Sequence, residues 1–297
     1  MSKRGNFDVL GKYGWCVPSW ADIFILIALL LVGALIGSGV VMLASLCMGE
    51  NSSAFVAEYT TLISYPIMFI PPMLWAAGKS RRNRMQYKGL ALDNGNVAPL
   101  GWTVCALLVI AATFAGGIVG DLFTSWLPPM PDWLEQAMKG LTTGSFWIDF
   151  ICVSIFAPFF EEWLCRGMVE RGLLGRGVKP VWAIVFSALF FALIHLNPWQ
   201  AIPAFIVGCL FGYVYYKTGS LKLTMLMHFT NNTFALVVGH IDSIKDAETW
   251  MDVLGSGYWY CFAAAVLLLV LVVKTFAKIP VERPCGGFTV LPSAFEG

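Results

Sequence analysis

Residues 159–166 read Phe-Phe-Glu-Glu-Trp-Leu-Cys-Arg, so two glutamates and an arginine lie inside a stretch otherwise made of large apolar side chains. A charged side chain near the centre of a membrane-spanning helix costs roughly 2.5–3.5 kcal/mol on insertion scales. If the chain lies in a membrane, Glu161, Glu162 and Arg166 therefore need either a structural partner or a chemical role.

The composition indicates a membrane protein. Of the 297 residues, 58% are hydrophobic and 12% are charged, which is about half the charged fraction of an ordinary soluble domain. Apolar runs long enough to cross roughly 30 Å of hydrocarbon recur along the chain, each bounded by glycine, proline or charge. We expect an all-α protein with about eight transmembrane helices, at 21–47, 55–78, 99–126, 146–170, 181–197, 200–217, 222–239 and 257–275.

The basic residues predict how these helices are oriented, because lysine and arginine accumulate in short cytoplasmic loops. With the N-terminus in the cytoplasm, only Lys139 and Lys245 fall in outer loops, and Arg166 lies within a helix. The other basic residues, 16 of the 19, then lie on the cytoplasmic side. The pattern predicts an integral, multi-pass membrane protein with both termini in the cytoplasm.

Other features of the composition limit the possible functions. The net charge is +1, and no basic block is interleaved with aromatic residues, so no nucleic-acid partner is expected. The eight cysteines include no CxxC pair, so no disulfide framework is indicated. Residues 127–145 begin with prolines and place apolar side chains at helical spacing, which predicts a short helix on the outer surface.

The three charged residues do not share one face of the fourth predicted helix. Glu162 and Arg166 are four residues apart, so they lie on the same side and can form an ion pair. Glu161 is turned about 100° away, which leaves its carboxyl group free to face a cavity. For Glu162 and Arg166, a buried ion pair that holds helices together is as good an interpretation as a catalytic one.

Two of the three histidines also lie in apolar spans. His195 ends the fifth predicted helix, and His228 begins the seventh, where it shares a face with Asn232 four residues later. A single histidine in an apolar helix is usually a hydrogen-bonded core residue. Two histidines, an asparagine and an unpaired glutamate together favour a site. The third histidine, His240, lies beside Asp242 at a predicted loop and is interpreted as a surface residue.

Spacing predicts that these groups meet. The fourth and fifth helices form a hairpin with its tip near Val178, and Glu161 and His195 each lie 17 residues from that tip. In an uninterrupted hairpin they lie at one level. Asn197-Pro198 is then expected to break the chain at membrane depth, where irregular backbone is tolerated only beside a cavity.

Three motifs occur in order on these helices: Glu-Glu-x-x-x-Arg from Glu161, Phe-x-x-x-His ending at His195, and His-x-x-x-Asn from His228. This set resembles the CPBP family of intramembrane proteases, also called Abi or type II CAAX prenyl endopeptidase-like proteins. The resemblance covers about residues 147–240. It implies an intramembrane endopeptidase with an active-site cavity, acting on a membrane-associated protein or peptide at the lipid bilayer, expected in a bacterial cell membrane.

The resemblance also implies roles for the residues of the motifs. Glu161 is implied to be the base that activates water, with His195 acting beside it. Glu162 and Arg166 are implied to organise the site, and His228 with Asn232 to orient water or to stabilise the oxyanion. These roles suit peptide hydrolysis, which needs an activated water molecule and a donor for the tetrahedral oxyanion.

The sequence leaves open whether the site holds a metal ion. A catalytic zinc site has mixed oxygen and nitrogen ligands, which are offered here by Glu161, His195 and His228. The family that the motifs resemble is also named for metalloproteases. The HExxH motif is absent, and a mechanism that relies on glutamate without metal is equally compatible with these residues.

Two other classes of function remain. The same polar cluster in a non-catalytic membrane protein forms an ion or proton path, or belongs to an inactive protease that scaffolds other proteins. Substrate and oligomeric state are not predicted. The expected organisation is a cytoplasmic segment at 1–20, transmembrane helices at 21–146, the protease-like core at 147–240, an outer loop and last helix at 241–276, and a cytoplasmic tail at 277–297.

Overall fold

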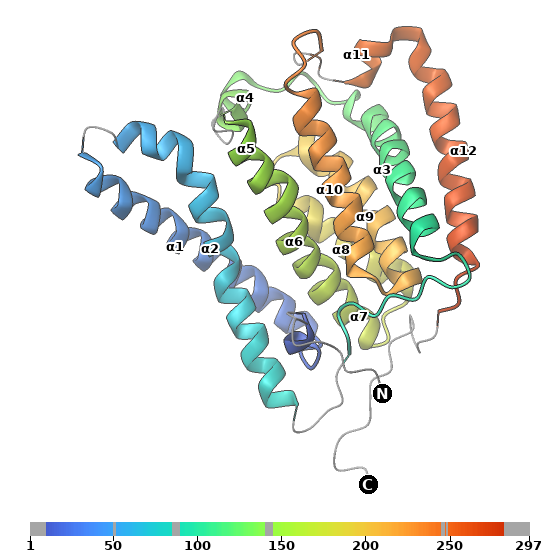
Figure 1. Ribbon diagram of the computed structural model, residues 1–297, viewed down its shortest axis with the longest axis horizontal. Helices are drawn as coiled ribbons and strands as arrows, with labels where there is room; N and C mark the ends of the chain where they lie inside the picture. The colour runs from blue at the N-terminus through green and yellow to red at the C-terminus, as the bar shows by residue number, and fades with distance from the viewer. Residues whose placement is uncertain are drawn as a thin grey trace.

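The computed structural model describes residues 10–49, 52–84, 90–139, 145–244, 247 and 249–281. These residues form helices and connecting loops without a strand, which confirms the all-α class (Figure 1). Most of the predicted tail at 277–297, and residues 1–9 of the predicted N-terminal segment, lie outside the described residues.

Every predicted span corresponds to a helix or a run of helical segments. After the short η1 (Gly11–Tyr13), the separate helices are α1 (Trp20–Cys47), α2 (Ser52–Asn83), α3 (Trp102–Thr124), α4 (Asp132–Lys139), α8 (Pro180–Leu193), α9 (Pro198–Thr218) and α10 (Leu221–Val238). The fourth span is a continuous run of α5 (Phe146–Asp149), η3 (Phe150–Phe156), α6 (Ala157–Glu162), η4 (Trp163–Glu170) and α7 (Arg171–Gly175). The last is α11 (Trp250–Leu254), η5 (Gly255–Gly257) and α12 (Tyr258–Ala277).

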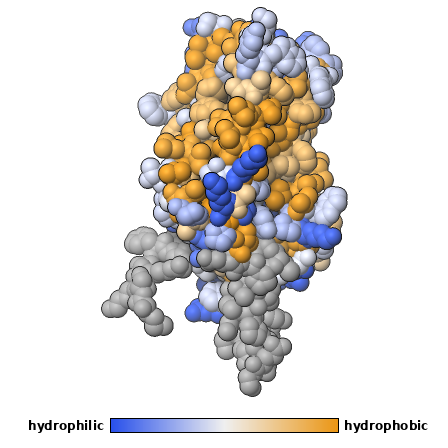
Figure 2. Space-filling model, turned by 90° about the vertical axis from the view of Figure 1, so that its right-hand side faces the viewer, coloured by the Kyte–Doolittle hydropathy of each residue, from blue (hydrophilic) through white to orange (hydrophobic). Residues whose placement is uncertain are grey.

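Five of these segments are long and apolar enough to cross a membrane, namely α1, α2, α3, α9 and the α11–α12 segment. The helix α8 is apolar but shorter, and α10 carries the polar residues His228, Asn231 and Asn232. Figure 2 views the side of the bundle on which α12 lies, and hydrophobic residues cover most of that face. Side chains such as Leu267 and Leu271 are exposed there, at 60% and 53%, as expected for a surface in contact with lipid.

Loops predicted on one side of the membrane meet at one end of the bundle. The Leu90 N–H donates to the Gly14 carbonyl over 2.6 Å, and the Asn94 N–H donates to the Gly219 carbonyl over 2.9 Å. The Asn96 side chain reaches the Pro280 carbonyl at 3.5 Å. The two ends of the described chain therefore lie at the same end, as an even number of spans requires.

Arg171 is one of the basic residues predicted to lie on the cytoplasmic side. Its side chain is fully buried. Its guanidinium donates to the carbonyl of Leu90 over 2.7 Å, to that of Gly167 over 2.6 Å, and to that of Cys16. Because these carbonyls come from three separate segments, Arg171 ties the N-terminal segment and the loop before α3 to the end of the fourth span.

The predicted break after the fifth span is confirmed. The helix α8 ends at Leu193, and Leu196 adopts a φ of 57°, a region that leucine rarely occupies. Asn197 caps the start of α9, and its side chain accepts a hydrogen bond from the Gln200 N–H. At the other end of α9, Gly219 with a φ of 62° and the capping residue Ser220 make the turn into α10. This short connection sets α9 and α10 side by side, and both helices contact the fourth span.

Candidate active site

Glu162 and Arg166 form the ion pair that their spacing predicts. Arg166 Nη1 lies 2.8 Å from Glu162 Oε1, and both side chains have no exposed surface. Isolated charges of this kind are strongly unfavourable in a low-dielectric interior. Further polar contacts are therefore needed to offset the cost of burying the pair.

Arg166 finds those contacts on α8 and α9. Its Nη2 donates to the Gly208 carbonyl over 2.9 Å, and its guanidinium lies 4.8 Å and 5.3 Å from the ring centres of Phe191 and Phe211. A Cβ added to Gly208 would lie 3.3 Å from Arg166 Nη2, so glycine leaves room for the guanidinium. Arg166 thus joins three helices through a hydrogen bond and two cation–π contacts.

His228 of α10 lies against both glutamates. Its Nδ1 is 3.0 Å from Glu162 Oε1, the same oxygen that accepts from Arg166. Since an ionised carboxylate only accepts hydrogen bonds, this nitrogen carries the donated hydrogen. Its Nε2 then points to Glu161, and lies 3.9 Å from Glu161 Oε2.

Glu161 is held from a helix that the motifs do not include. The Tyr65 hydroxyl of α2 donates to Glu161 Oε1. The other oxygen, Oε2, has no hydrogen-bond partner among the described residues, and 13% of the side chain is exposed. Glu162 in contrast has no exposed surface. Glu161 has no arginine partner among the described residues, as its position on the helix predicts. That it faces a cavity stays a prediction, since Oε2 is buried.

The two glutamates lie on a short α-helical segment between two π-helical ones. Seven residues before Ala157 and eight after Glu162 adopt the wider π form, in η3 and η4. Such segments are rare and are frequently found at functional sites. The wider turn changes which side chains face the bundle, and regular α-helical periodicity does not predict it.

His195 makes no hydrogen bond with Glu161 in the part of the chain that is described. Its Nδ1 donates to the Phe191 carbonyl over 2.8 Å. The Phe191 ring contacts both histidines, with its centre 5.1 Å from that of His195 and 5.4 Å from that of His228. One helical turn before Phe191 on α8, the Ser187 hydroxyl donates to the Cys165 carbonyl over 2.9 Å. That His195 and Glu161 lie at one level stays a prediction.

Asn232 connects α10 to the π-helical segment η3. Its side-chain amide donates to the Val153 carbonyl over 2.9 Å, and its oxygen accepts from the Asn231 amide over 3.2 Å. One hydrogen of the Asn232 amide is used in this contact and a second is available. Asn232 and His228 therefore face the fourth span from one side of α10.

The predicted metal ligands do not form a ligand set in this arrangement. Within the described ranges, no three histidine, cysteine, aspartate or glutamate side chains are placed to hold one metal ion. Glu161 and His228 lie near each other, but His195 has its own contact with Phe191. No step is assigned to a metal, and zinc stays a prediction from the sequence.

Tyr65 is the contact residue that the sequence analysis missed. It lies 96 positions before Glu161, in a span that carries none of the three motifs. The available signal was weak, namely a phenol in an apolar helix, where a buried hydroxyl usually finds a partner.

Comparison with known proteins gives one match. The family model for Type II CAAX prenyl endopeptidase Rce1-like matches residues 143–234, which contain all three motifs. No curated protein and no solved structure matches the chain significantly. The family match confirms the resemblance predicted from the motifs, and with the long apolar helices it points to a protease integral to a membrane.

Proposed function

We propose that the protein is an intramembrane endopeptidase in which Glu161 and His228 activate a water molecule for attack on a peptide bond. The proposed substrate is a membrane-associated protein or peptide that reaches the site from the bilayer. The family match supports the class of reaction, and the arrangement of the two side chains supports the mechanism.

The observation that carries the proposal is the 3.9 Å separation of Glu161 Oε2 and His228 Nε2. This separation is too long for a direct hydrogen bond, and it suits a water molecule that donates to both atoms. Oε2 has no protein partner among the described residues, and Nε2 is the nitrogen left with a lone pair when Nδ1 donates to Glu162. A water held in this way presents its oxygen for attack while either acceptor takes its proton.

Glu162 and Arg166 act as positioning residues in this mechanism. Glu162 fixes the tautomer and the orientation of His228, in the way that a buried carboxylate orients the catalytic histidine of a serine protease. Arg166 holds Glu162 in place through the 2.8 Å contact between Nη1 and Oε1. Tyr65 holds Glu161 by one oxygen, so the other oxygen stays turned toward the water.

The oxyanion is assigned to a donor on α10. Asn232 has an amide hydrogen beyond the one that it gives to Val153. Donors of this kind stabilise the tetrahedral intermediate in a site that excludes water. His195 donates through Nδ1 to the Phe191 carbonyl, so its Nε2 is left to accept a hydrogen bond from the substrate.

A proton path is the second class of function, and the buried charges weigh against it. Glu170 is fully buried and lies four residues beyond Arg166, so Glu162, Arg166 and Glu170 form one series along the helix. An arginine does not release its proton in proteins. Arg166 therefore interrupts any transfer from Glu162 to Glu170.

The proposal is tested by comparing membranes that contain the wild type with membranes that contain Glu161→Gln. The substitution keeps the shape of the side chain and removes the base. Newly formed peptide termini should appear only with the wild type, at equal protein levels. The matched control is Glu135→Gln on the exposed face of α4, which should give the wild-type fragments. Identical fragments with Glu161→Gln would overturn the proposal.

A further inference from the structure

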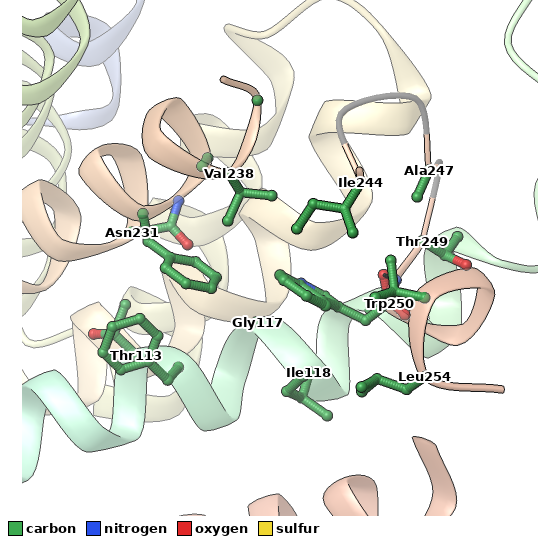
Figure 3. Close-up of a pocket in the computed structure, with 16 residues that line it drawn as sticks. Thr113, Gly117, Ile118, Asn231, Val238, Ile244, Ala247, Thr249, Trp250 and Leu254 are labelled. Atoms are coloured by element: carbon green, nitrogen blue, oxygen red, sulfur yellow. Dashed lines mark hydrogen bonds between the residues drawn. The ribbon is translucent and has the colours of Figure 1, made fainter. Parts of the chain in front are cut away.

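A cavity lies on a different side of α10 from Glu161. It has a volume of about 540 Å³ and is lined by residues of α3, α10 and α11 together with Ile244 and Ala247. Figure 3 shows Thr113 and Gly117 of α3 along one wall, Asn231 and Val238 of α10 along another, and Trp250 of α11 reaching across. None of the residues assigned to the candidate active site lines it.

The walls of this cavity are apolar and aromatic. The rings of Phe114 and Phe234 meet edge to face at 4.9 Å, and the rings of Phe234 and Trp250 stack at 5.6 Å with an angle of 21° between them. Three aromatic side chains therefore form a continuous apolar lining. The volume falls in the range of roughly 300–1,000 Å³ that is typical of small-molecule sites.

Among the described residues, one charged side chain lines the cavity, and one of its two carboxylate oxygens has no hydrogen-bond partner there. Asp121 is only 9% exposed, and its Oδ1 accepts a hydrogen bond from the Trp250 N–H over 2.9 Å. Its Oδ2 is buried and has no hydrogen-bond partner among the described residues. A buried acceptor without a partner costs about 1–3 kcal/mol, and more if it is charged. Asp121 is therefore placed to receive a donor from a ligand.

Gly117 shows where a ligand has room. A Cβ added to this residue meets no atom within 4 Å, although Gly117 lies in the middle of α3 and lines the cavity. Thr113 also lines it and lies eight residues before Asp121. At 1.5 Å per residue, the cavity follows α3 for about 12 Å from the carboxylate. It can hold an elongated apolar group with its polar end at Asp121.

We propose that this cavity binds a membrane-dissolved amphiphile with a protonated amine head, which pairs with Asp121 while its apolar chain lies along the three rings. A cation satisfies the free carboxylate oxygen and is also attracted to the aromatic faces. Among the described residues that line the cavity, the charged one is Asp121, and it repels an anionic head. This binding does not depend on the proposed proteolysis.

The experiment uses dodecylamine with bromine at the end of its chain, because bromine quenches tryptophan fluorescence on contact. The purified full chain is titrated in neutral detergent with this amine and with the alcohol and the carboxylate of the same length. Quenching should saturate with the amine, and the saturating part should disappear in Trp250→Phe. The alcohol should bind roughly 10–100-fold more weakly, as expected from losing a hydrogen bond between two charged groups.

Two variants test separately the contribution of the Asp121 carboxylate and that of the open space beside Gly117. Asp121→Asn should weaken the amine by the same roughly 10–100-fold and leave the alcohol unchanged. Gly117→Leu should remove saturable quenching by all three probes, because the new side chain enters open space and improves a helix position. Asp132→Asn, an exposed residue of α4, is the matched control for the loss of one acidic group.

Equal affinity for the amine and the alcohol would overturn the proposal, because the cavity would then take up any apolar chain. Unchanged affinity in Gly117→Leu would also overturn it. If Asp121→Asn does not fold, two results still decide the outcome. They are the affinities of the three probes for the wild type and the quenching measured with Gly117→Leu.

Discussion

Replacing Arg166 with methionine should lower the stability of the protein by about 3–5 kcal/mol, the usual effect of removing one partner from a buried ion pair. The structure explains why the loss of stability should reach this range. Neither Glu162 nor Arg166 has any exposed surface, so water cannot replace the guanidinium. Methionine fills much of the same volume, so the loss reflects the charge rather than a large cavity.

Two further variants divide this loss into its parts. Arg166→Lys keeps the positive charge, but a single ammonium cannot reach both Glu162 and the Gly208 carbonyl as the guanidinium does. It should cost about 1.5–3 kcal/mol, the value of one charged hydrogen bond. The double variant Arg166→Met with Glu162→Gln removes the unpaired charge, so it should be more stable than Arg166→Met alone.

The measurement is the fraction of protein that stays folded in neutral detergent after heating, together with its abundance in the membrane. The single variant Glu162→Gln completes a double-mutant cycle with wild type, Arg166→Met and the double variant, and this cycle gives the coupling between the two residues. The expected order of stability is wild type, then Arg166→Lys, then Arg166→Met, with recovery in the double variant. Wild-type stability in Arg166→Met, or additive losses in the double variant, would refute a buried ion pair at this position.

Four other outcomes are expected. Tyr65→Phe should reduce kcat by roughly 10–100-fold at unchanged abundance, because Glu161 loses one charged hydrogen bond; unchanged turnover would remove Tyr65 from the site. Asn232→Ala should reduce kcat by on the order of 10²–10³-fold if its amide stabilises the oxyanion, and wild-type kcat would assign that role elsewhere. Proteolysis should survive chelation with purified protein holding less than one zinc per chain, and a reversible loss of activity would instead establish the predicted zinc. A reporter fused after Gly297 should lie in the cytoplasm and one inserted near Thr142 outside, and the reverse would contradict the topology.

The local part of the candidate site could be predicted from the sequence. Residues four apart on one helix share a face, and this rule alone predicts the Glu162–Arg166 pair. It also places His228 and Asn232 on the same side of α10. Both predictions depend on helical geometry over one turn. For His228 and Asn232 that turn is regular in α10, and for Glu162 and Arg166 the contact forms although Arg166 lies in the π-helical segment η4.

The contacts between distant parts of the chain were harder to predict. Tyr65 reaches Glu161 from α2, and no pattern in the second span marks it. The expected level of His195 relies on two regular helices and stays a prediction, because the fourth span contains two π-helical segments and packs with Cys165 opposite Ser187. How two helices fit together depends on their side chains, and spacing along one chain does not contain that information.

Arg171 and Asp121 show the same limit for charged residues. The charge pattern predicts that Arg171 lies on the cytoplasmic side, and the sequence indicates no partner for either residue. In the structure, Arg171 is buried and binds carbonyls from three segments, while Asp121 caps α11 through the Trp250 N–H. Their surroundings come from parts of the chain far away in sequence, so composition and local pattern predict the side of the membrane but not the contact.

Hydrolysis by a water molecule activated at Glu161 is tested most directly by cleavage in water enriched in ¹⁸O. The purified wild type, given the substrate found in the membrane comparison, should produce a fragment whose new C-terminal carboxylate carries one ¹⁸O atom. Glu161→Gln, with the same fold and abundance, should produce no labelled fragment. A labelled fragment formed at the wild-type rate by Glu161→Gln would contradict the assignment of Glu161 as the base.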